Sequence, residues 1–412
     1  MGYRQSLLSG LGWIGFFRIS AKALVFLKII IAYRVLSPRE VGLYGLCLIA
    51  LGLLEMLTET GVNVIIVKES KPLSYYLDTA FIVSVGRGLL ITLILFFASF
   101  LLPSFFNDSG LFPLMLLLSL IPTIRGFINP AVAKFQKDLA FSKDALLKLS
   151  TIVTDVGFSV LFVFLFPSAI SLISGMIISA FGEVLISFIF IRPWPKWKYN
   201  GEVFHAIVSP GKWVNLAGLI TYAEQNFDNV VVGRILGSTA LGYYQTAFNL
   251  TRSLITEVGL TFSQVLLPIF GKIGEEKARL MRAVLRVFLP AVSIMMLPAI
   301  FLNIPYIQKL LLLSLGEKWA PMTPLLPYLS IAALFAGMNT LCNPLYFVKN
   351  SYRSLVFMYG SNLLIMIIAI VYMIPYFGLV GAARGVLLAR ILMQPFFVWR
   401  TLKLLNEEKK II

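Results

Sequence analysis

The chain has 412 residues, of which 58% are hydrophobic and only 13% are charged, and its formal net charge is +16. This composition lies far from that of soluble proteins and predicts a multi-pass membrane protein. The two cysteines, Cys47 and Cys342, lie far apart in apolar runs, so neither a disulfide framework nor a thiolate metal cluster is indicated. We therefore expect neither a metal ion nor a cofactor.

Apolar runs long enough to cross a membrane follow one another along the whole sequence. A membrane-spanning helix needs about 20 mostly apolar residues. That length predicts twelve spans, at residues 11–33, 41–67, 77–103, 111–133, 146–166, 169–191, 207–233, 239–269, 285–303, 322–347, 354–375 and 379–402. The segment 303–321 is the longest loop on the predicted outer side. A proline-, tryptophan- and lysine-rich connection separates the first six spans from the last six, so we expect an N-terminal lobe (1–192), a cytoplasmic linker (193–206) and a C-terminal lobe (207–412).

An internal repeat relates the two predicted lobes. The stretch from Arg34 to Tyr44 returns as the stretch from Arg234 to Tyr244, with Arg, Leu, Gly and Tyr in the same frame. Repetition at a fixed offset indicates two copies of one structural unit. Because each half has an even number of spans, both enter the membrane in the same sense. The predicted fold is therefore an all-α integral membrane protein with two six-helix lobes, related by a pseudo-two-fold axis along the membrane normal.

The distribution of basic residues predicts the orientation in the membrane. Lys and Arg gather in alternate loops, which are the cytoplasmic ones if both termini are cytoplasmic. The net charge is thus mainly a topology signal with an affinity for anionic membrane lipids, and we expect no nucleic-acid partner. The predicted location is the cytoplasmic membrane.

Charged residues inside the predicted spans are the candidates for function. A charge that faces lipid near the bilayer centre costs at least about 2.5–3.5 kcal/mol, so such residues face a protein interior or a wet cavity. Four-residue spacing places pairs of like charges on single helix faces, as in Glu224 and Asp228. Under the repeat, Lys28 and Asp228 occupy equivalent positions.

Two interpretations of these charges remain open. In the first, they pair across helices and hold or gate the lobes. In the second, cations attract an anionic head group, since Arg and Lys are the usual partners of phosphate, and buried acids exchange protons or cations. The candidate substrate-binding cations are Arg18, Lys22, Lys28, Arg87, Arg125 and Arg252. The candidate polar or coupling residues are Glu55, Glu59, Glu224, Gln225, Asn226, Asp228 and Glu257.

Enzyme chemistry finds little support in the sequence. The single histidine, His205, lies at the predicted cytoplasmic start of a span, without a catalytic-triad motif around it. A Gly-rich loop followed by Lys and Ser or Thr, as in ATP-hydrolysing proteins, is missing from the sequence. The longest predicted outer loop is too short to hold a polymerase or glycosyltransferase domain. We therefore expect a protein that is not an enzyme and has no catalytic residues.

Three stretches resemble the repeats of the bacterial and archaeal polysaccharide flippases, the Wzx-type transporters. They are Leu36–Tyr44 followed by Gly61, Gly233–Tyr244 followed by Leu267 and Pro268, and the connection Phe135–Phe141. That family belongs to a superfamily that also contains multidrug/cation antiporters and lipid II flippases.

The resemblance implies two lobes around a central cavity that opens alternately to each side. It implies that a polyprenyl-diphosphate-linked oligosaccharide is flipped from the cytoplasmic to the outer leaflet for cell-surface polysaccharide biosynthesis. It also implies a functional monomer that works with polysaccharide polymerase and assembly proteins. The alternative is a cation-coupled drug or metabolite antiporter, in which Glu55, Glu59, Glu224 and Asp228 are the coupling acids. Gly381 and Gly385, four residues apart, predict a close helix–helix contact.

Overall fold

The computed structural model describes residues 20–58, 66, 71–138, 140–208, 212–273 and 277–406. Within these ranges the backbone is almost entirely helical and contains no strand. Contacts between residues divide the chain into two compact units, Met1–Lys212 (unit 1) and Trp213–Ile412 (unit 2). In the described part of the chain, 6 helices are long and apolar enough to cross a membrane, or 8 if each of two bent helix pairs is one span. The chain is therefore a multi-pass helical membrane protein.

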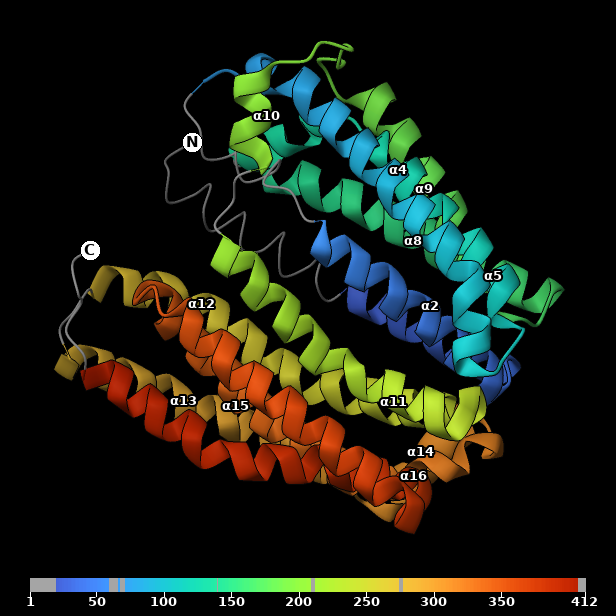
Figure 1. Cartoon of the computed structure of the whole chain (residues 1–412), viewed down its shortest axis with the longest axis vertical. Helices are drawn as coiled ribbons and strands as arrows, with labels where there is room; N and C mark the ends of the chain where they lie inside the picture. Colours follow the sequence, from blue (N-terminus) through green and yellow to red (C-terminus); the bar gives the residue numbers. More distant parts are fainter. Residues whose placement is uncertain are drawn as a thin grey trace. The chain divides into compact units, whose positions relative to one another are not determined.

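The first described element of unit 1 is helical over residues 20–35 (Figure 1). The following elements are α2 (Pro38–Leu57), α4 (Leu73–Phe106), α5 (Leu111–Leu118), α6 (Leu120–Gly126), the 3₁₀ turn η1 (Pro130–Ala133), α7 (Lys134–Lys137), α8 (Phe141–Leu165), α9 (Ala169–Phe190) and α10 (Gly201–Val208). Helix α4 contacts α2, α5, α6 and α10, and α8 packs along α9. The first predicted span starts before the described residues, so only its second part can be compared.

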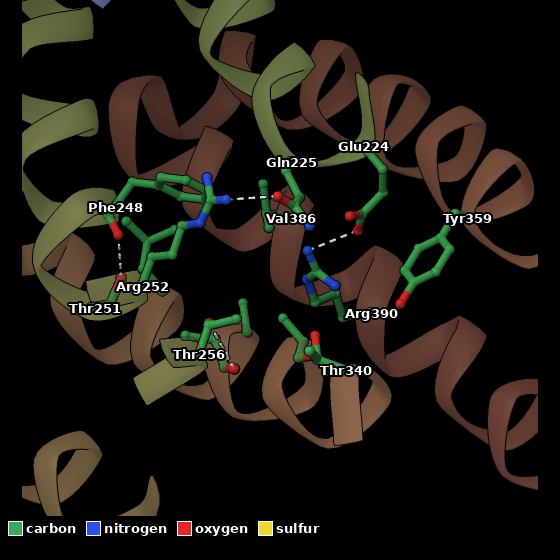
Figure 2. Close-up of a pocket in the computed structure, with 14 residues that line it drawn as sticks. Glu224, Gln225, Phe248, Thr251, Arg252, Thr256, Thr340, Tyr359, Val386 and Arg390 are labelled. Carbon is green, nitrogen blue, oxygen red and sulfur yellow. Dashed lines mark hydrogen bonds and ion pairs between the residues drawn. The ribbon is translucent and has the colours of Figure 1, made fainter. Parts of the chain in front are cut away.

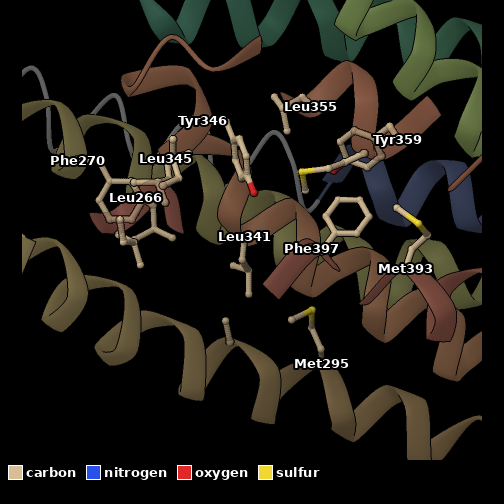
Figure 3. Packing of buried hydrophobic residues seen from close by; sticks show 14 of the residues in the cluster. Leu266, Phe270, Met295, Leu341, Leu345, Tyr346, Leu355, Tyr359, Met393 and Phe397 are labelled. Atoms are coloured by element: carbon tan, nitrogen blue, oxygen red, sulfur yellow. The ribbon is translucent and has the colours of Figure 1, made fainter. Parts of the chain in front are cut away.

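Unit 2 contains two helices, α11 and α16, that are each divided by a sharp break. Its elements are α11 (Lys212–Thr251), the π turn η2 (Arg252–Thr256), α12 (Glu257–Ile273), α13 (Lys277–Phe301), α14 (Pro305–Leu315), the 3₁₀ segment η3 (Glu317–Leu325), α15 (Leu326–Val348) and α16 (Tyr352–Asn406). Helix α15 contacts α12, α13 and α16 and forms the middle of the unit. A buried cluster that includes Leu266, Met295, Leu341, Tyr346 and Phe397 joins these helices (Figure 3).

The repeated stretch has the same local structure in both units, namely a break between two helical segments. In unit 1 the helix at 20–35 ends and α2 begins at Pro38, with the Ser37 side chain accepting a hydrogen bond from the Glu40 amide. In unit 2 the break lies inside α11 at Gly237, whose φ of 83° favours glycine because a Cβ is poorly tolerated there. These breaks are offset by the same 200 residues as the sequence repeat.

Helix α16 consists of two segments that meet at Gly378, between the predicted spans 354–375 and 379–402. The segments run back along each other, because a Cβ on Gly385 would lie 2.8 Å from the Ile370 Cα and one on Gly381 would overlap the Met373 carbonyl oxygen. Glycine at both positions lets the backbones approach, so the predicted close helix contact is confirmed.

Residues 303–321 were predicted to form a loop, but most of them are helical. They form α14 and the beginning of η3. Proline at the first position of α14 suits a helix start, and four consecutive leucines continue it. The helix has only 11 residues, fewer than the roughly 20 that a membrane-spanning helix needs, so the apolar-run length did not reveal it. It is bent by 70° from the helical residues 286–301. The predicted span 111–133 is likewise divided, into α5, α6 and η1.

Candidate functional site

Unit 2 contains a polar cavity between α11, η2, α15 and α16. Its polar lining includes Glu224, Gln225, Arg252, Thr340, Tyr359 and Arg390 (Figure 2). The space that the centres of water molecules can occupy inside it is ≈ 30 Å³, which is room for about two waters. In this conformation the cavity has room for water molecules that hydrate its polar groups.

A buried ion pair forms one wall of the cavity. The Arg390 Nη2 lies 2.7 Å from the Glu224 Oε1, and the two side chains are 7% and 2% exposed. The Asn362 side-chain amide donates a second hydrogen bond of 2.6 Å to the same carboxylate oxygen. Glu224 is therefore bound by one cation and one neutral donor, from the two segments of α16. The pair compensates two charges that would each be costly inside a membrane protein.

Arg252 lies on the opposite wall, at the start of the π turn η2. Its Nη2 donates a hydrogen bond of 2.6 Å to the Gln225 Oε1, as Figure 2 shows. Gln225 is neutral, so this contact orients the guanidinium without cancelling its charge. Single π turns inside helices are rare and are frequent at functional sites. Arg252 is thus a half-buried cation whose orientation is fixed by Gln225 and whose guanidinium has N–H groups besides the one bonded to Gln225.

One helical turn along α11, Asp228 is enclosed by neutral donors. It accepts hydrogen bonds from the Tyr244 hydroxyl (2.7 Å), the Asn229 amide (2.9 Å) and the Asn229 side chain (2.9 Å). Asp228 is 1% exposed, and the Asn229 Oδ1 is buried without a hydrogen-bond partner. Asn226 instead donates to the Tyr222 carbonyl oxygen within the helix. Asp228 is therefore a buried acid held by neutral hydrogen-bond donors.

Unit 1 has a cation where unit 2 has Asp228. Lys28 is buried, and its Nζ lies 2.9 Å from both carboxylate oxygens of Asp155 on α8. Ser159 donates a further hydrogen bond of 3.2 Å to the same carboxylate. The charge of Lys28 is thus neutralised within unit 1 by a residue 127 positions away in the sequence.

Two arginines of unit 1 converge on the end of α2. The Arg87 Nη2 donates to the Glu55 carbonyl oxygen (2.7 Å), and its Nε donates to the Thr58 hydroxyl (3.2 Å). A cation suits this position, because helix C-termini carry partial negative charge. The Arg125 Nη1 lies 3.8 Å from the Glu55 carboxylate, and its Nε is buried without a hydrogen-bond partner. Arg87 and Arg125 therefore keep donors available for another group.

We assign no functional contact to the four remaining candidates. Arg18 and Glu59 lie outside the described residues. Lys22 is exposed, and Glu257 is half-buried at the start of α12. Among the described residues, no cluster of three or more His, Cys, Asp or Glu side chains could hold a metal ion.

The structure adds Arg390, Asn362 and Asp155 to the candidate residues. Arg390 and Asp155 could be recognised in the sequence only as charges inside apolar runs, and Asn362 only as an amide in such a run. Their partners lie far away in the chain, so their pairing left no local signal.

Comparison with solved structures defines the class of fold. The chain is similar to the inward-facing conformation of a MATE-family multidrug resistance transporter of the MOP superfamily, with a TM-score of 0.73, 15% identity, and coverage of 94% of this chain and 96% of that one. It is also similar to the lipid II flippase MurJ in an inward closed conformation, with a TM-score of 0.68, 14% identity, and coverage of 97% and 89%. At such identities these likenesses show the fold alone.

Sequence comparison defines the family. Residues 30–324 match the model of the family described as polysaccharide biosynthesis protein, so the chain belongs to that family. It is 25% identical over 401 residues to the lipopolysaccharide biosynthesis protein WzxC of Escherichia coli (strain K12), covering 95% of this chain and 80% of that protein. It is 20% identical over 292 residues to the teichuronic acid biosynthesis protein TuaB of Bacillus subtilis (strain 168), covering 70% of this chain and 60% of that protein. The predicted membership in the Wzx-type polysaccharide flippases is confirmed.

Proposed function

We propose that this protein moves a polyprenyl-diphosphate-linked oligosaccharide from the cytoplasmic to the outer leaflet of the cytoplasmic membrane, for cell-surface polysaccharide biosynthesis. The observation that carries the proposal is the family match over residues 30–324, which runs from the first helix of unit 1 into η3 of unit 2. The similarity to WzxC supports it. Transport, rather than catalysis, is the activity proposed.

The proposed architecture has twelve spans in two six-helix lobes, 1–192 and 207–412, joined by a cytoplasmic linker at 193–206. A pseudo-two-fold axis along the membrane normal relates the lobes, and both termini are cytoplasmic. Alternating access moves the substrate through a cavity between the lobes. The protein acts as a monomer and delivers its product to polysaccharide polymerase and assembly proteins. The equal 200-residue offset of the sequence repeat and of the helix breaks supports the two-lobe arrangement.

Among the candidate cations, Arg87, Arg125 and Arg252 are the proposed diphosphate-binding residues. The partners of Arg87 and Arg252 are neutral, and Arg125 has a buried Nε without a hydrogen-bond partner. Arginine presents several N–H donors in a planar fork that matches phosphate oxygens. Lys28 has its charge occupied by Asp155, which favours the pairing interpretation for that residue. Gln225 and Asn226 are proposed to hydrogen-bond sugar hydroxyls.

The test uses a strain that lacks this gene, and measures lipid-linked oligosaccharide in the membrane together with polysaccharide on the surface. We expect the precursor to accumulate and the surface glycan to disappear. The wild-type gene should restore export, whereas Arg87→Gln and Arg252→Gln should restore about a tenth or less, since a charge-assisted hydrogen bond contributes about 1.5–3 kcal/mol.

Arg384→Gln is the matched control for the two arginine variants. The Arg384 guanidinium donates to the Tyr328 hydroxyl (3.0 Å) and lies 4.5 Å from the Phe377 ring. Its replacement should leave export near the wild-type level. If precursor and surface glycan are both unchanged in the deletion strain while sensitivity to cationic drugs rises, the flippase proposal is wrong and the cation-coupled antiporter replaces it.

A further inference from the structure

The loop between α9 and α10, residues 191–200, turns several aromatic rings outward. Trp194 is 50% exposed, Trp197 is 67% exposed and Tyr199 is 63% exposed. Large exposed aromatic side chains that lie close together mark a surface that contacts something other than water. The loop begins directly after α9, which is one of the helices long and apolar enough to cross a membrane. These rings therefore follow directly after the end of a helix that has the length and composition of a membrane span.

Hydrogen bonds from other elements fix the path of this loop. The Asn129 side-chain amide donates to the carbonyl oxygens of Ile191 (3.3 Å) and Pro193 (3.2 Å). The Lys196 amide donates to the Asp78 carboxylate on α4 (2.8 Å). Beyond the last ring, the Asn200 amide donates to the Thr79 hydroxyl on α4 (3.0 Å). Because the backbone is held before, between and after the aromatic rings, their exposure is built into the fold.

The following helix, α10, is also attached to unit 1. Its residues Val203 and Ile207 are buried in a cluster with Tyr76, Ala80 and Ala133. Figure 1 draws α10 beside the beginning of α4, the helix that it contacts. The loop and α10 thus form one platform on unit 1.

Cations alternate with the aromatic rings along the loop. Arg192, Lys196 and Lys198 are exposed, and no carboxylate of the described residues lies within ion-pair distance of them. The Arg192 guanidinium lies 3.5 Å from the centre of the Trp194 ring, so cation and ring are presented together. This loop accordingly presents three exposed positive charges among its rings, and none of the three forms an ion pair with a described residue.

We infer that residues 192–199 form a binding surface for anionic phospholipid head groups, which anchors unit 1 at the membrane interface. Trp and Tyr rings settle at the level of the head groups, and each Lys or Arg near a negatively charged leaflet adds attraction. Charge complementarity and the position at the end of a span select a lipid surface over a protein partner. This inference does not depend on the transported substrate.

The test measures lipid binding to the full-length protein in detergent by native mass spectrometry, with phosphatidylglycerol, phosphatidylcholine or inorganic diphosphate as the probe. We expect phosphatidylglycerol to bind more tightly than phosphatidylcholine, and diphosphate alone not to compete. Each lysine removed should lower phosphatidylglycerol affinity by about five-fold, so Lys196→Gln with Lys198→Gln should lower it by about 25-fold. The matched control, Lys134→Gln with Lys143→Gln, removes the same charge from exposed positions in unit 1 outside the loop and should change it by less than about three-fold.

A second readout locates the lipid on the protein. Brominated phosphatidylglycerol should quench tryptophan fluorescence more than brominated phosphatidylcholine, and this difference should shrink in Trp194→Phe with Trp197→Phe. Equal affinity of both lipids, an equal loss in the control variant, or unchanged quenching without the two tryptophans would overturn the inference. Competition by diphosphate alone would also overturn it, because it would identify a site for free phosphate instead of a lipid surface.

Discussion

Arg390→Gln is the variant that most directly tests the polar cavity of unit 2. The substitution removes the cation that lies 2.7 Å from the Glu224 carboxylate. Among the described residues, that carboxylate, 2% exposed, then keeps the Asn362 amide as its one hydrogen-bond donor. Removal of one partner of a buried ion pair typically costs about 3–5 kcal/mol, because the other charge stays buried without compensation. For a domain of about 200 residues this corresponds to an unfolding midpoint lowered by about 6–20 °C.

The assay is thermal unfolding of the full-length protein in detergent, with the double variant Glu224→Gln, Arg390→Gln as the second arm. The double variant should recover most of the lost stability, since two neutral amides leave no buried charge and can hydrogen-bond each other. Arg384→Gln removes a charge-assisted hydrogen bond to the neutral Tyr328 hydroxyl and should cost about 1.5–3 kcal/mol, less than Arg390→Gln, because it leaves no buried charge without a partner. If Arg390→Gln unfolds at the wild-type temperature, or if the double variant is less stable than the single one, the ion pair does not stabilise unit 2.

Three further changes test local features of the fold. Gly259→Ala should lower stability by about 1–3 kcal/mol, because its Cβ would lie 2.6 Å from a carbonyl oxygen of α15. The control Gly157→Ala should not lower stability, because no atom lies within 4 Å of its Cβ. Equal thermal unfolding midpoints for the two variants would contradict the close contact at Gly259. Ser37→Ala should cost about 1 kcal/mol in thermal unfolding, since it removes the N-cap of α2, and an unchanged midpoint would show that the cap contributes nothing. Tyr244→Phe removes the hydroxyl that donates to Asp228 and should cost about 1.5–3 kcal/mol, a loss that Asp228→Asn in the same chain should reduce if the charged hydrogen bond is its cause.

The sequence was sufficient for features that depend on spacing along the chain. The repeat from Arg34 to Tyr44 predicted two related halves, and the structure has helix breaks at both copies. Gly381 and Gly385 predicted a close backbone contact because small residues four apart share one helix face. Helix α14 could not be found in this way, since its 11 residues are too few to be recognised as a span.

The partners of the intramembrane charges could not be predicted, for a physical reason. Helical periodicity places a side chain on a face of its own helix, but it does not say which other helix that face meets. Lys28 and Asp155 are 127 residues apart, and Glu224 and Asn362 are 138 residues apart. From the sequence alone, any other oppositely charged residue in the predicted spans was an equally good candidate partner for Lys28 or Glu224. Helix packing decides the pairing, and it places one predicted substrate cation, Lys28, against a carboxylate of its own unit.

Charge reversal at Lys28 separates the two roles that a cation in this family can have. In the variant Lys28→Asp, Asp155→Lys the ion pair of unit 1 is rebuilt with its direction inverted, so stability should return close to the wild-type value. Lys28→Asp alone places a buried carboxylate beside the half-buried Asp155 carboxylate and should be strongly destabilised. If Lys28 only holds the helix at 20–35 against α8, the double variant should also restore polysaccharide export in the deletion strain. A double variant that is stable and present in the membrane but inactive would instead assign Lys28 to the substrate. We expect export to be restored, because both Asp155 oxygens lie 2.9 Å from the ammonium group and occupy the contacts that a diphosphate would need.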